Sequence, residues 1–136
     1  MNKMITNLHN SIALPMTLSK VSFRRKFTFE DRLNESSKII LKYPHRVPVI
    51  VEKSRRDTLI KNINKRKYLV PCSLTIGQFL YVIRKRLTLG PEKALFLFIA
   101  GEHIPPTGSL LGNIYEKYAN KDKFLYITYS GENVFG

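Results

Sequence analysis

The sequence predicts one domain of the α+β class. Three segments, at 28–43, 75–87 and 109–118, carry apolar residues at helical spacing. Four apolar segments have the length of strands, and the predicted helices and strands do not alternate one for one along the chain. A chain of 136 residues buries enough apolar surface for one self-sufficient core. The single cysteine, Cys72, excludes an internal disulfide, so we expect this core alone to hold the fold together.

The first long helix is predicted over 28–43. Thr28 precedes Asp31 by three residues, which is the spacing of a capping box, and Pro44 prevents the helix from continuing. Its apolar face is expected to consist of Phe29, Leu33, Ser36 and Ile40. The segment just before it, "KVSFRRKF", places two phenylalanines four residues apart and predicts a further short helical turn.

The first two strands are predicted at 46–52 and 67–71 from their β-branched and apolar residues. Pro71 ends the second strand. Because proline cannot donate a ladder hydrogen bond, this strand suits the edge of a sheet better than its centre. The charged loop between the two strands, 53–66, is long enough to indicate a functional or mobile segment.

The second long helix, at 75–87, is expected to pack across the sheet. Its apolar face consists of Ile76, Phe79, Leu80, Ile83 and Leu87. The basic run Arg84, Lys85 and Arg86 lies near its C-terminal end, where cations interact favourably with the helix dipole.

The remaining elements complete the expected topology. The segment "ALFLFIA", at 94–100, is apolar throughout, which predicts a central strand covered on both faces. A short helix at 109–118 leads to a last strand at 124–129. A hairpin crossed by one helix, with later strands added beside it, is the layout of the ubiquitin-like β-grasp.

Residues that could perform catalysis are not grouped in the sequence. It contains no glycine-rich phosphate loop, no paired metal-ligand spacing and no Gly-x-Ser-x-Gly turn. His9, His45 and His103 lie in three separate segments without cysteine or carboxylate neighbours at ligand spacing. We therefore expect surface histidines, no metal, no resident cofactor and no enzyme activity.

The charge of the chain is strongly positive. Its 23 Lys and Arg residues against 10 Asp and Glu give a formal charge of +13, with clusters "RRK", "KRK" and "RKR". Such clusters suit nucleic acid, an anionic membrane surface or acidic stretches of partner proteins. Most aromatic residues fall at core-like positions rather than between the basic ones, which disfavours a base-stacking platform. A basic ubiquitin-like module that binds nucleic acid, and whose terminal glycine is joined to no other molecule, remains the alternative function.

The N-terminal segment is expected to lie outside the folded domain. Polar residues and a proline interrupt its apolar pattern, which excludes a secretory signal and a membrane span. No acidic residue precedes Glu30, whereas Lys3, Lys20 and Arg24 do, which is also the charge bias of an organelle transit peptide. We expect a disordered extension over residues 1–18, with the transit peptide as the alternative.

Two long stretches carry a more specific signal. They are "RKYLVPCSLTIGQFLYVIRKRLTLGPEKALFLFIAGEHIPPTGSLLGNIYEKY" and "DKFLYITYSGENVFG". Here the chain closely resembles the ubiquitin-like modifiers of autophagy, the family of autophagy-related protein 8 and GABARAP. The resemblance extends back through "YPHRVPVIVEK" to about Lys20. It implies a β-grasp core at 46–130, two additional N-terminal helices within 19–45, and a flexible conjugation tail at 131–136.

The resemblance implies that the C-terminal glycine, Gly136, becomes joined to phosphatidylethanolamine. In the family, E1-like and E2-like enzymes carry the glycine to this lipid, and a cysteine protease matures and deconjugates the protein. No residue follows Gly136 in this sequence, so we expect the forward step to need no protease. The implied location is the cytoplasm before conjugation, and autophagosomal and vacuolar or lysosomal membranes after it.

The resemblance also implies recruitment of receptors that carry a short aromatic-x-x-aliphatic motif. An edge strand accepts such a peptide as an added strand, with two pockets for alternate side chains. The implied aromatic-side pocket consists of Glu35, Ile39, Pro48, Ile50, Lys67, Leu69 and Phe124. The implied aliphatic-side pocket consists of Tyr68, Val70, Pro71, Leu74, Phe79 and Val82. Lys67 and Arg84 would attract acidic residues that flank the motif.

This sequence departs from the family pattern at three places. The first 18 residues are extra, the loop between the first two strands is about one residue longer, and the "AGEHIPP" turn is slightly expanded. None of these changes falls on a residue of the two implied pockets.

Overall fold

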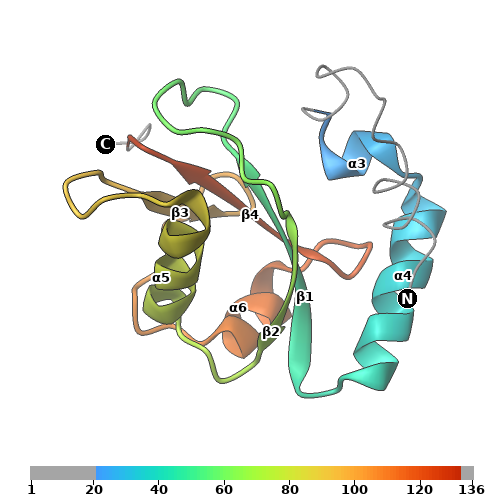
Figure 1. The fold of residues 1–136 in the computed structure, drawn as a ribbon. Coiled ribbons are helices and arrows are strands. Elements are labelled where there is room, and N and C mark those ends of the chain that lie inside the picture. The colour runs from blue at the N-terminus through green and yellow to red at the C-terminus, as the bar shows by residue number, and fades with distance from the viewer. Residues whose placement is uncertain (1–20, 133–136) are drawn as a thin grey trace.

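The structure is a computed structural model, and it describes residues 21–132 of the chain. Within this range four helices and four strands follow one another in the order α3, α4, β1, β2, α5, β3, α6 and β4 (Figure 1). The helices span Phe23–Lys26, Phe29–Lys42, Ile76–Leu87 and Leu111–Tyr118. The strands span Arg46–Lys53, Lys67–Pro71, Phe96–Ile99 and Leu125–Ser130. This mixture confirms the predicted α+β class.

The strands form one mixed sheet in the order β2-β1-β4-β3. β1 pairs antiparallel with β2 and parallel with β4, while β3 pairs antiparallel with β4. β2 is therefore an edge strand, as the position of Pro71 predicted. The two longest strands, β1 and β4, lie side by side at the centre.

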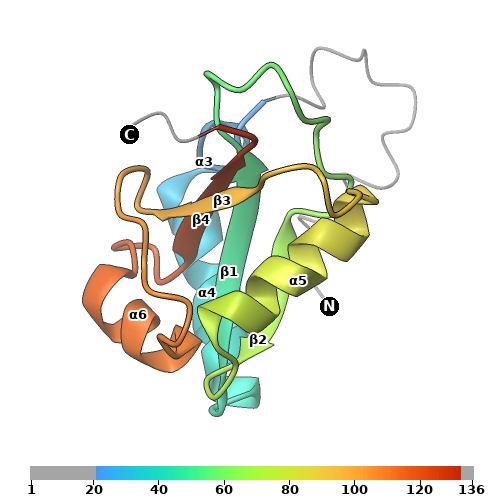
Figure 2. The ribbon, with the colours of Figure 1, turned by 90° about the vertical axis from the view of Figure 1, so that its left-hand side faces the viewer.

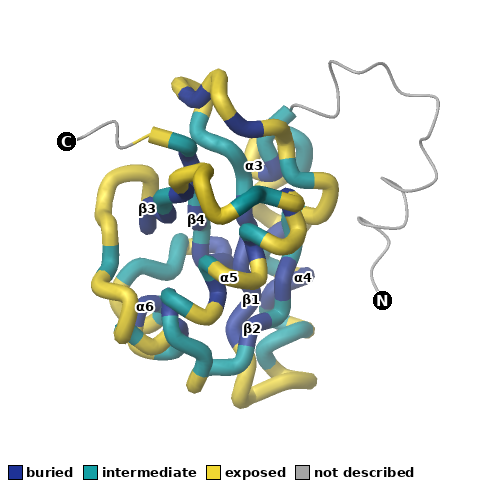
Figure 3. The backbone as a smooth tube through the Cα atoms, turned by 60° about the vertical axis from the view of Figure 1, so that its left-hand side comes forward, coloured by how far each residue is buried: buried dark blue, intermediate teal, exposed yellow. Residues whose placement is uncertain are grey.

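Helices cover both faces of the sheet. In Figure 2, α5 and α6 lie in front of the sheet and α3 and α4 behind it. Strand residues alternate between these faces: Val49 and Val51 belong to the cluster on the α5 side, whereas Ile50 contacts the cluster around α3. Figure 3 shows buried residues gathered along the strands and exposed residues mostly in the loops.

The face covered by α5 and α6 contains the main hydrophobic core. α5 contributes Ile76, Phe79, Ile83 and Leu87, which are 0–3% exposed, so the predicted apolar face is confirmed apart from the partly buried Leu80. Thr75 caps the helix through a complete capping box with Gln78. Cys72 is a free thiol that packs partly buried against this core.

The face covered by α4 differs from the sequence-based expectation. The helix itself is confirmed, with Thr28 accepting the backbone N–H of Asp31. Its buried residues are Arg32, Glu35 and Ser36, whereas Phe29 is 46% exposed. Arg32 reaches the carboxylate of the fully buried Asp122, and this partner lies in a loop 90 residues further along the chain. The inward face of α4 is therefore largely polar.

The prediction of a central strand at 94–100 was wrong about its place in the sheet. β3 is shorter, Phe96–Ile99, and lies at the edge opposite β2. Leu97, Phe98 and Ile99 are nonetheless at most 4% exposed. A continuous apolar run indicates that both faces of a strand are buried, but it does not predict which strands pair with it.

The proposed boundaries between extension, helical segment, core and tail stay predictions. Residues 1–18 and the tail beyond residue 132 lie outside the described part of the chain. Within residues 21–132, no helix is both long enough and apolar enough to cross a membrane.

Candidate functional site

The outer edge of β2 presents backbone groups to solvent. The N–H of Val51 donates to the carbonyl of Arg66 at 2.7 Å, and the N–H of Cys72 donates to His45 at 3.0 Å. These bonds fix the alternation of the antiparallel pair, so the N–H and C=O of Lys67 and Leu69 point away from the backbone of β1. The Leu69 carbonyl accepts a long hydrogen bond, 3.5 Å, from the guanidinium of Arg46. An extended peptide could therefore pair with β2 at these two residues.

The two sets of implied pocket residues lie on opposite faces of the sheet beside this edge. The side chains of β2 alternate, with Tyr68 and Val70 in the main core under α5. Lys67 reaches Glu35 of α4 on the other face. The structure thus brings together residues from α4, β1, β2 and α5 around one short strand, and the division into two pockets stays a prediction.

The aromatic-side set is closed by a charged pair. Lys67 forms an ion pair with Glu35, and their side chains are 13% and 4% exposed. Beneath them, Ile50 and Phe124 are fully buried. Neither charged group has a further hydrogen-bond partner among the described residues. An aromatic ring that enters this set would therefore have to displace the Lys67–Glu35 pair. Apart from the ion pair itself, no hydrogen bond among the described residues holds these two side chains in place.

Burial changes the protonation of Lys67. It lowers the pKa of the Lys67 ammonium to about 7, although Glu35 beside it favours the charged form. The amine lies 5.8 Å from the ring centre of Phe23 and 6.0 Å from that of Phe124. These ring faces favour a cation but replace the water that would otherwise solvate it.

Phe23 belongs to the aromatic-side set, although the sequence analysis did not include it. It is 1% exposed and forms one cluster with Ile50 and Phe124. Its ring centre lies 5.3 Å from that of Phe124 and 5.1 Å from that of Phe27. The spacing of Phe23 and Phe27 predicted their shared side of a helical turn. It did not predict the contact of Phe23 with Phe124.

The aliphatic-side set is continuous with the main core. Tyr68 and Phe79 meet edge to face with ring centres 5.6 Å apart. Val82 is 40% exposed, while Leu74 and Pro71 are partly buried. Ile39 and Leu69, from the aromatic-side set, are also partly buried, and Pro48 is buried. The sets therefore mix accessible side chains with side chains that hold the fold.

Two further implied residues remain, Arg84 and Gly136. Arg84 donates to the carbonyl of Gly90 at 2.7 Å, just beyond the end of α5, so part of its guanidinium is engaged within the chain. Gly136 lies outside the described residues.

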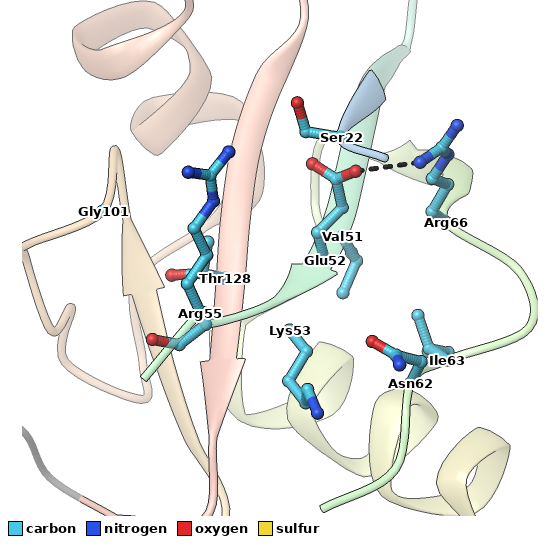
Figure 4. Close-up of a pocket in the computed structure, with 11 residues that line it drawn as sticks. Ser22, Val51, Glu52, Lys53, Arg55, Asn62, Ile63, Arg66, Gly101 and Thr128 are labelled. Carbon is cyan, nitrogen blue, oxygen red and sulfur yellow. Dashed lines mark hydrogen bonds and ion pairs between the residues drawn. The ribbon is translucent and has the colours of Figure 1, made fainter. Parts of the chain in front are cut away.

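Two hollows in the described surface are lined by residues outside β2. One of about 350 Å³ lies where β1 ends, between α3 and the following loop (Figure 4). Glu52 pairs there with Arg66 at 3.0 Å, while Lys53 and Arg55 extend in different directions. Another of about 370 Å³ lies between α6 and the loop that contains His103. Within residues 21–132, no group of three or more His, Cys, Asp or Glu residues could hold a metal ion.

Comparison with known proteins gives a consistent result. Residues 31–136 match the family described as "Autophagy protein Atg8 ubiquitin like". Autophagy-related protein 8 from Schizosaccharomyces pombe is 57% identical over 114 residues, covering 84% of this chain and 93% of that protein. Its counterpart from Candida glabrata is 52% identical over 117 residues, covering 86% and 98%. Autophagy-related protein 8a from Arabidopsis thaliana is 52% identical over 119 residues, covering 88% and 96%. These matches confirm the predicted ubiquitin-like fold.

Proposed function

Because this chain belongs to the Atg8 family of ubiquitin-like autophagy proteins, we propose that it is a non-enzymatic modifier conjugated through Gly136 to phosphatidylethanolamine. The observation that carries this proposal is the family match, which extends to residue 136. Autophagy machinery is the corresponding class of partner. The alternative of a nucleic-acid-binding module is not favoured by the matches.

The proposed chemistry is acyl transfer from the carboxylate of Gly136. An E1-like enzyme activates this carboxylate with ATP, and the acyl group then passes as a thioester to cysteines of the E1-like and E2-like enzymes. The amine of phosphatidylethanolamine attacks the thioester carbonyl, an amide bond forms, and the thiol leaves. Glycine suits this step because it has no side chain beside the reacting carbonyl and the widest range of backbone angles.

Conjugation also provides the membrane attachment. The described helices offer no membrane span, whereas the two acyl chains of a phospholipid give stable anchoring because each buried methylene contributes about 0.8 kcal/mol. The protein would therefore move from the cytoplasm to autophagosomal and vacuolar or lysosomal membranes when conjugated.

A reconstituted conjugation reaction tests this proposal. The 136-residue chain is incubated with ATP, the E1-like and E2-like enzymes and vesicles that contain phosphatidylethanolamine, and mass spectrometry measures the lipid adduct. We expect an adduct on Gly136 without added protease, no adduct after its deletion, and at least a tenfold lower rate for Gly136→Ala. Gly108→Ala is the matched control because a methyl group at Gly108 meets no atom within 4 Å.

Two results would overturn the proposal. One is the absence of an adduct under conditions that conjugate another family member. The other is equal conjugation of the intact chain and of the chain that lacks Gly136.

The same protein, we propose, recruits receptors through the edge of β2. Support comes from the outward backbone groups of Lys67 and Leu69 and from the flanking side chains on both sheet faces. A Trp-x-x-Leu peptide would add a strand beside β2, with its aromatic side chain on the α4 side and its aliphatic side chain on the α5 side. The cations on this surface would attract acidic residues next to the motif.

Substitution of Leu69 tests the docking edge. Leu69 is only partly buried, so Leu69→Ala should weaken a Trp-x-x-Leu peptide by about 1–3 kcal/mol without unfolding the domain. Leu41→Ala is the control, since Leu41 is 84% exposed on α4. Calorimetry at 50 and 300 mM salt also separates this mode from nucleic-acid binding, which weakens steeply with salt. Equal affinity of both variants would contradict the assignment.

A further inference from the structure

The loop between β1 and β2 is rich in basic residues. We call residues 54–66 the basic loop. Four of its cations are exposed, namely Arg55, Arg56, Lys61 and Lys65. Its only acidic residue, Asp57, is 3% exposed and accepts the N–H of Leu59 at 2.9 Å. The charge that the loop presents to solvent is therefore positive throughout.

An apolar side chain projects from the middle of this positive surface. Leu59 is 66% exposed, although its neighbour Ile60 is 6% exposed and belongs to the main core. The loop is held in this arrangement by β4, because the hydroxyl of Tyr129 donates to the carbonyl of Lys61 at 2.6 Å. The exposure of Leu59 follows from this anchoring.

The basic loop also touches the start of the segment that leads to Gly136. A methyl group added at Gly131 would lie 3.0 Å from Ile60 and 3.2 Å from Leu59. In Figure 2 the loop and the end of β4 lie at the same end of the molecule. Gly136 lies five positions after Gly131 in the sequence, and five chain steps span at most about 17 Å. A lipid on Gly136 would hold the basic loop within that distance of the headgroups.

We propose that the basic loop is a second membrane contact, in which its arginines and lysines bind anionic lipid headgroups and Leu59 inserts between them. This inference builds on the proposed conjugation, which brings the loop to the membrane. Each Lys or Arg held near an anionic surface strengthens binding about fivefold, and an apolar side chain among them adds buried area at the headgroup level. The loop thus selects membranes by charge and fixes how the protein lies on them.

A single tryptophan tests the insertion, because the chain contains none. Leu59→Trp is made in a Cys72→Ser background with a cysteine appended after Gly136, and this thiol is coupled to a maleimide lipid. The chemical tether replaces enzymatic conjugation. On vesicles with 30% phosphatidylserine, the tryptophan emission should shift to shorter wavelength and be quenched by brominated acyl chains.

Leu41→Trp in the same background is the matched control. Leu41 is a still more exposed leucine at 84%, and it is the last residue but one of α4. In Figure 1 this end of α4 and the basic loop lie at opposite ends of the molecule. Its emission should not change on the vesicles. Tethered to pure phosphatidylcholine, Leu59→Trp should also show little shift, since the anionic headgroups are absent.

A second measurement tests the arginines without a tether. Arg55→Gln with Arg56→Gln should lower the partition of the unconjugated chain onto phosphatidylserine vesicles about 25-fold. Lys38→Gln with Lys42→Gln removes the same charge from exposed positions on α4 and should lower it less than threefold. Equal losses in the two variants would show that net charge, rather than the basic loop, drives binding, and would overturn the proposal.

Two further outcomes would overturn it. One is an unshifted Leu59→Trp emission on tethered anionic vesicles. The other is a response of this tryptophan to single-stranded RNA but not to vesicles, which would make the loop a nucleic-acid surface. Because the tether needs no conjugation enzymes, failure here leaves the conjugation of Gly136 untouched. Conversely, a chain that resists enzymatic conjugation but inserts Leu59 when tethered would overturn only the proposed function.

Discussion

The two faces of the sheet are held by different interactions. On the α5 side, the helix buries Phe79, Ile83 and Leu87 against strand residues in a continuous apolar core. On the α4 side, the helix buries Arg32, Glu35 and Ser36 and attaches through hydrogen bonds and ion pairs. Apolar burial is the dominant favourable term in folding, whereas desolvation offsets much of the gain from buried ion pairs.

The two faces should therefore differ in how much they contribute to the free energy of unfolding and in how much they change when a partner binds. The α5 face should contribute most of the free energy of unfolding, and it should change little when a partner binds. The α4 face depends on hydrogen bonds and ion pairs, and its Lys67–Glu35 pair covers the aromatic-side set that the proposed peptide would have to open. The proposed recognition would therefore require a side-chain movement on the face whose helix is attached mainly by polar contacts.

The largest expected effect is on the α5 face. Ile83 is fully buried in the main core, and Ile83→Ala should lower the free energy of unfolding by about 2–5 kcal/mol through lost burial and a residual cavity. Urea denaturation with linear extrapolation measures this change. Leu41→Ala, at an 84% exposed leucine, should change it by no more than about 0.5 kcal/mol. Similar losses at both sites would contradict the assignment of the core.

A smaller effect is expected on the α4 face. The hydroxyl of Ser36 donates to the backbone carbonyl of Asp122 at 2.6 Å, and Ser36 is fully buried. Ser36→Ala keeps the small volume but removes this bond, so it should cost about 1 kcal/mol. The same denaturation experiment applies. A loss as large as that of Ile83→Ala would mean that the polar attachment carries as much stability as the apolar core.

The smallest net effect is expected where both charges are replaced together. Glu35→Leu with Lys67→Met removes the buried pair without leaving one charge alone, so stability at pH 7 should stay the same or rise slightly. Lys67→Met by itself leaves the Glu35 carboxylate buried without its partner and should be less stable than the double variant. The opposite order would indicate that the pair contributes strongly to stability.

The pH dependence sharpens this comparison. The pKa of Lys67 is lowered to about 7 in the folded protein, against about 10.5 in the unfolded chain. The unfolded state therefore binds more protons between these values, and wild-type stability should rise with pH from about 7. Above pH 10 the trend reverses, because burial raises the pKa of Tyr129 to about 12 and the unfolded tyrosine ionises first.

Stability measured from pH 6 to pH 9.5 tests this titration. The wild-type curve should rise relative to that of the Glu35→Leu, Lys67→Met variant, because only the wild type carries the buried amine. Tyr129 is present in both proteins, so its contribution cancels in the difference. Parallel curves would show that Lys67 keeps its ordinary pKa in the folded protein.

The elements that depend on local patterns were predictable from the sequence. Thr28 and Thr75 mark the starts of α4 and α5, the apolar spacing of α5 gives its buried face, and Pro71 indicates an edge strand. Each of these features depends on residues close together in the chain.

The features that depend on distant partners were not predictable in the same way. Arg32 is buried because it forms an ion pair with Asp122, which is 90 residues away in the sequence. No periodic pattern in the sequence predicts such a pair. Phe23 enters the aromatic-side set through its contact with Phe124, which lies far from it in the sequence. The edge position of β3 follows from the parallel pairing of β1 with β4, which no local pattern of either strand encodes.

The most direct test of recognition at β2 is residue-resolved amide hydrogen exchange by NMR, without and with a Trp-x-x-Leu peptide. In the free chain the N–H groups of Tyr68 and Val70 face β1, while those of Lys67 and Leu69 face solvent. We expect the peptide to slow exchange at Lys67 and Leu69 by at least tenfold and to change Tyr68 and Val70 much less. Binding that leaves the Lys67 and Leu69 amides as fast as before would contradict strand addition at this edge.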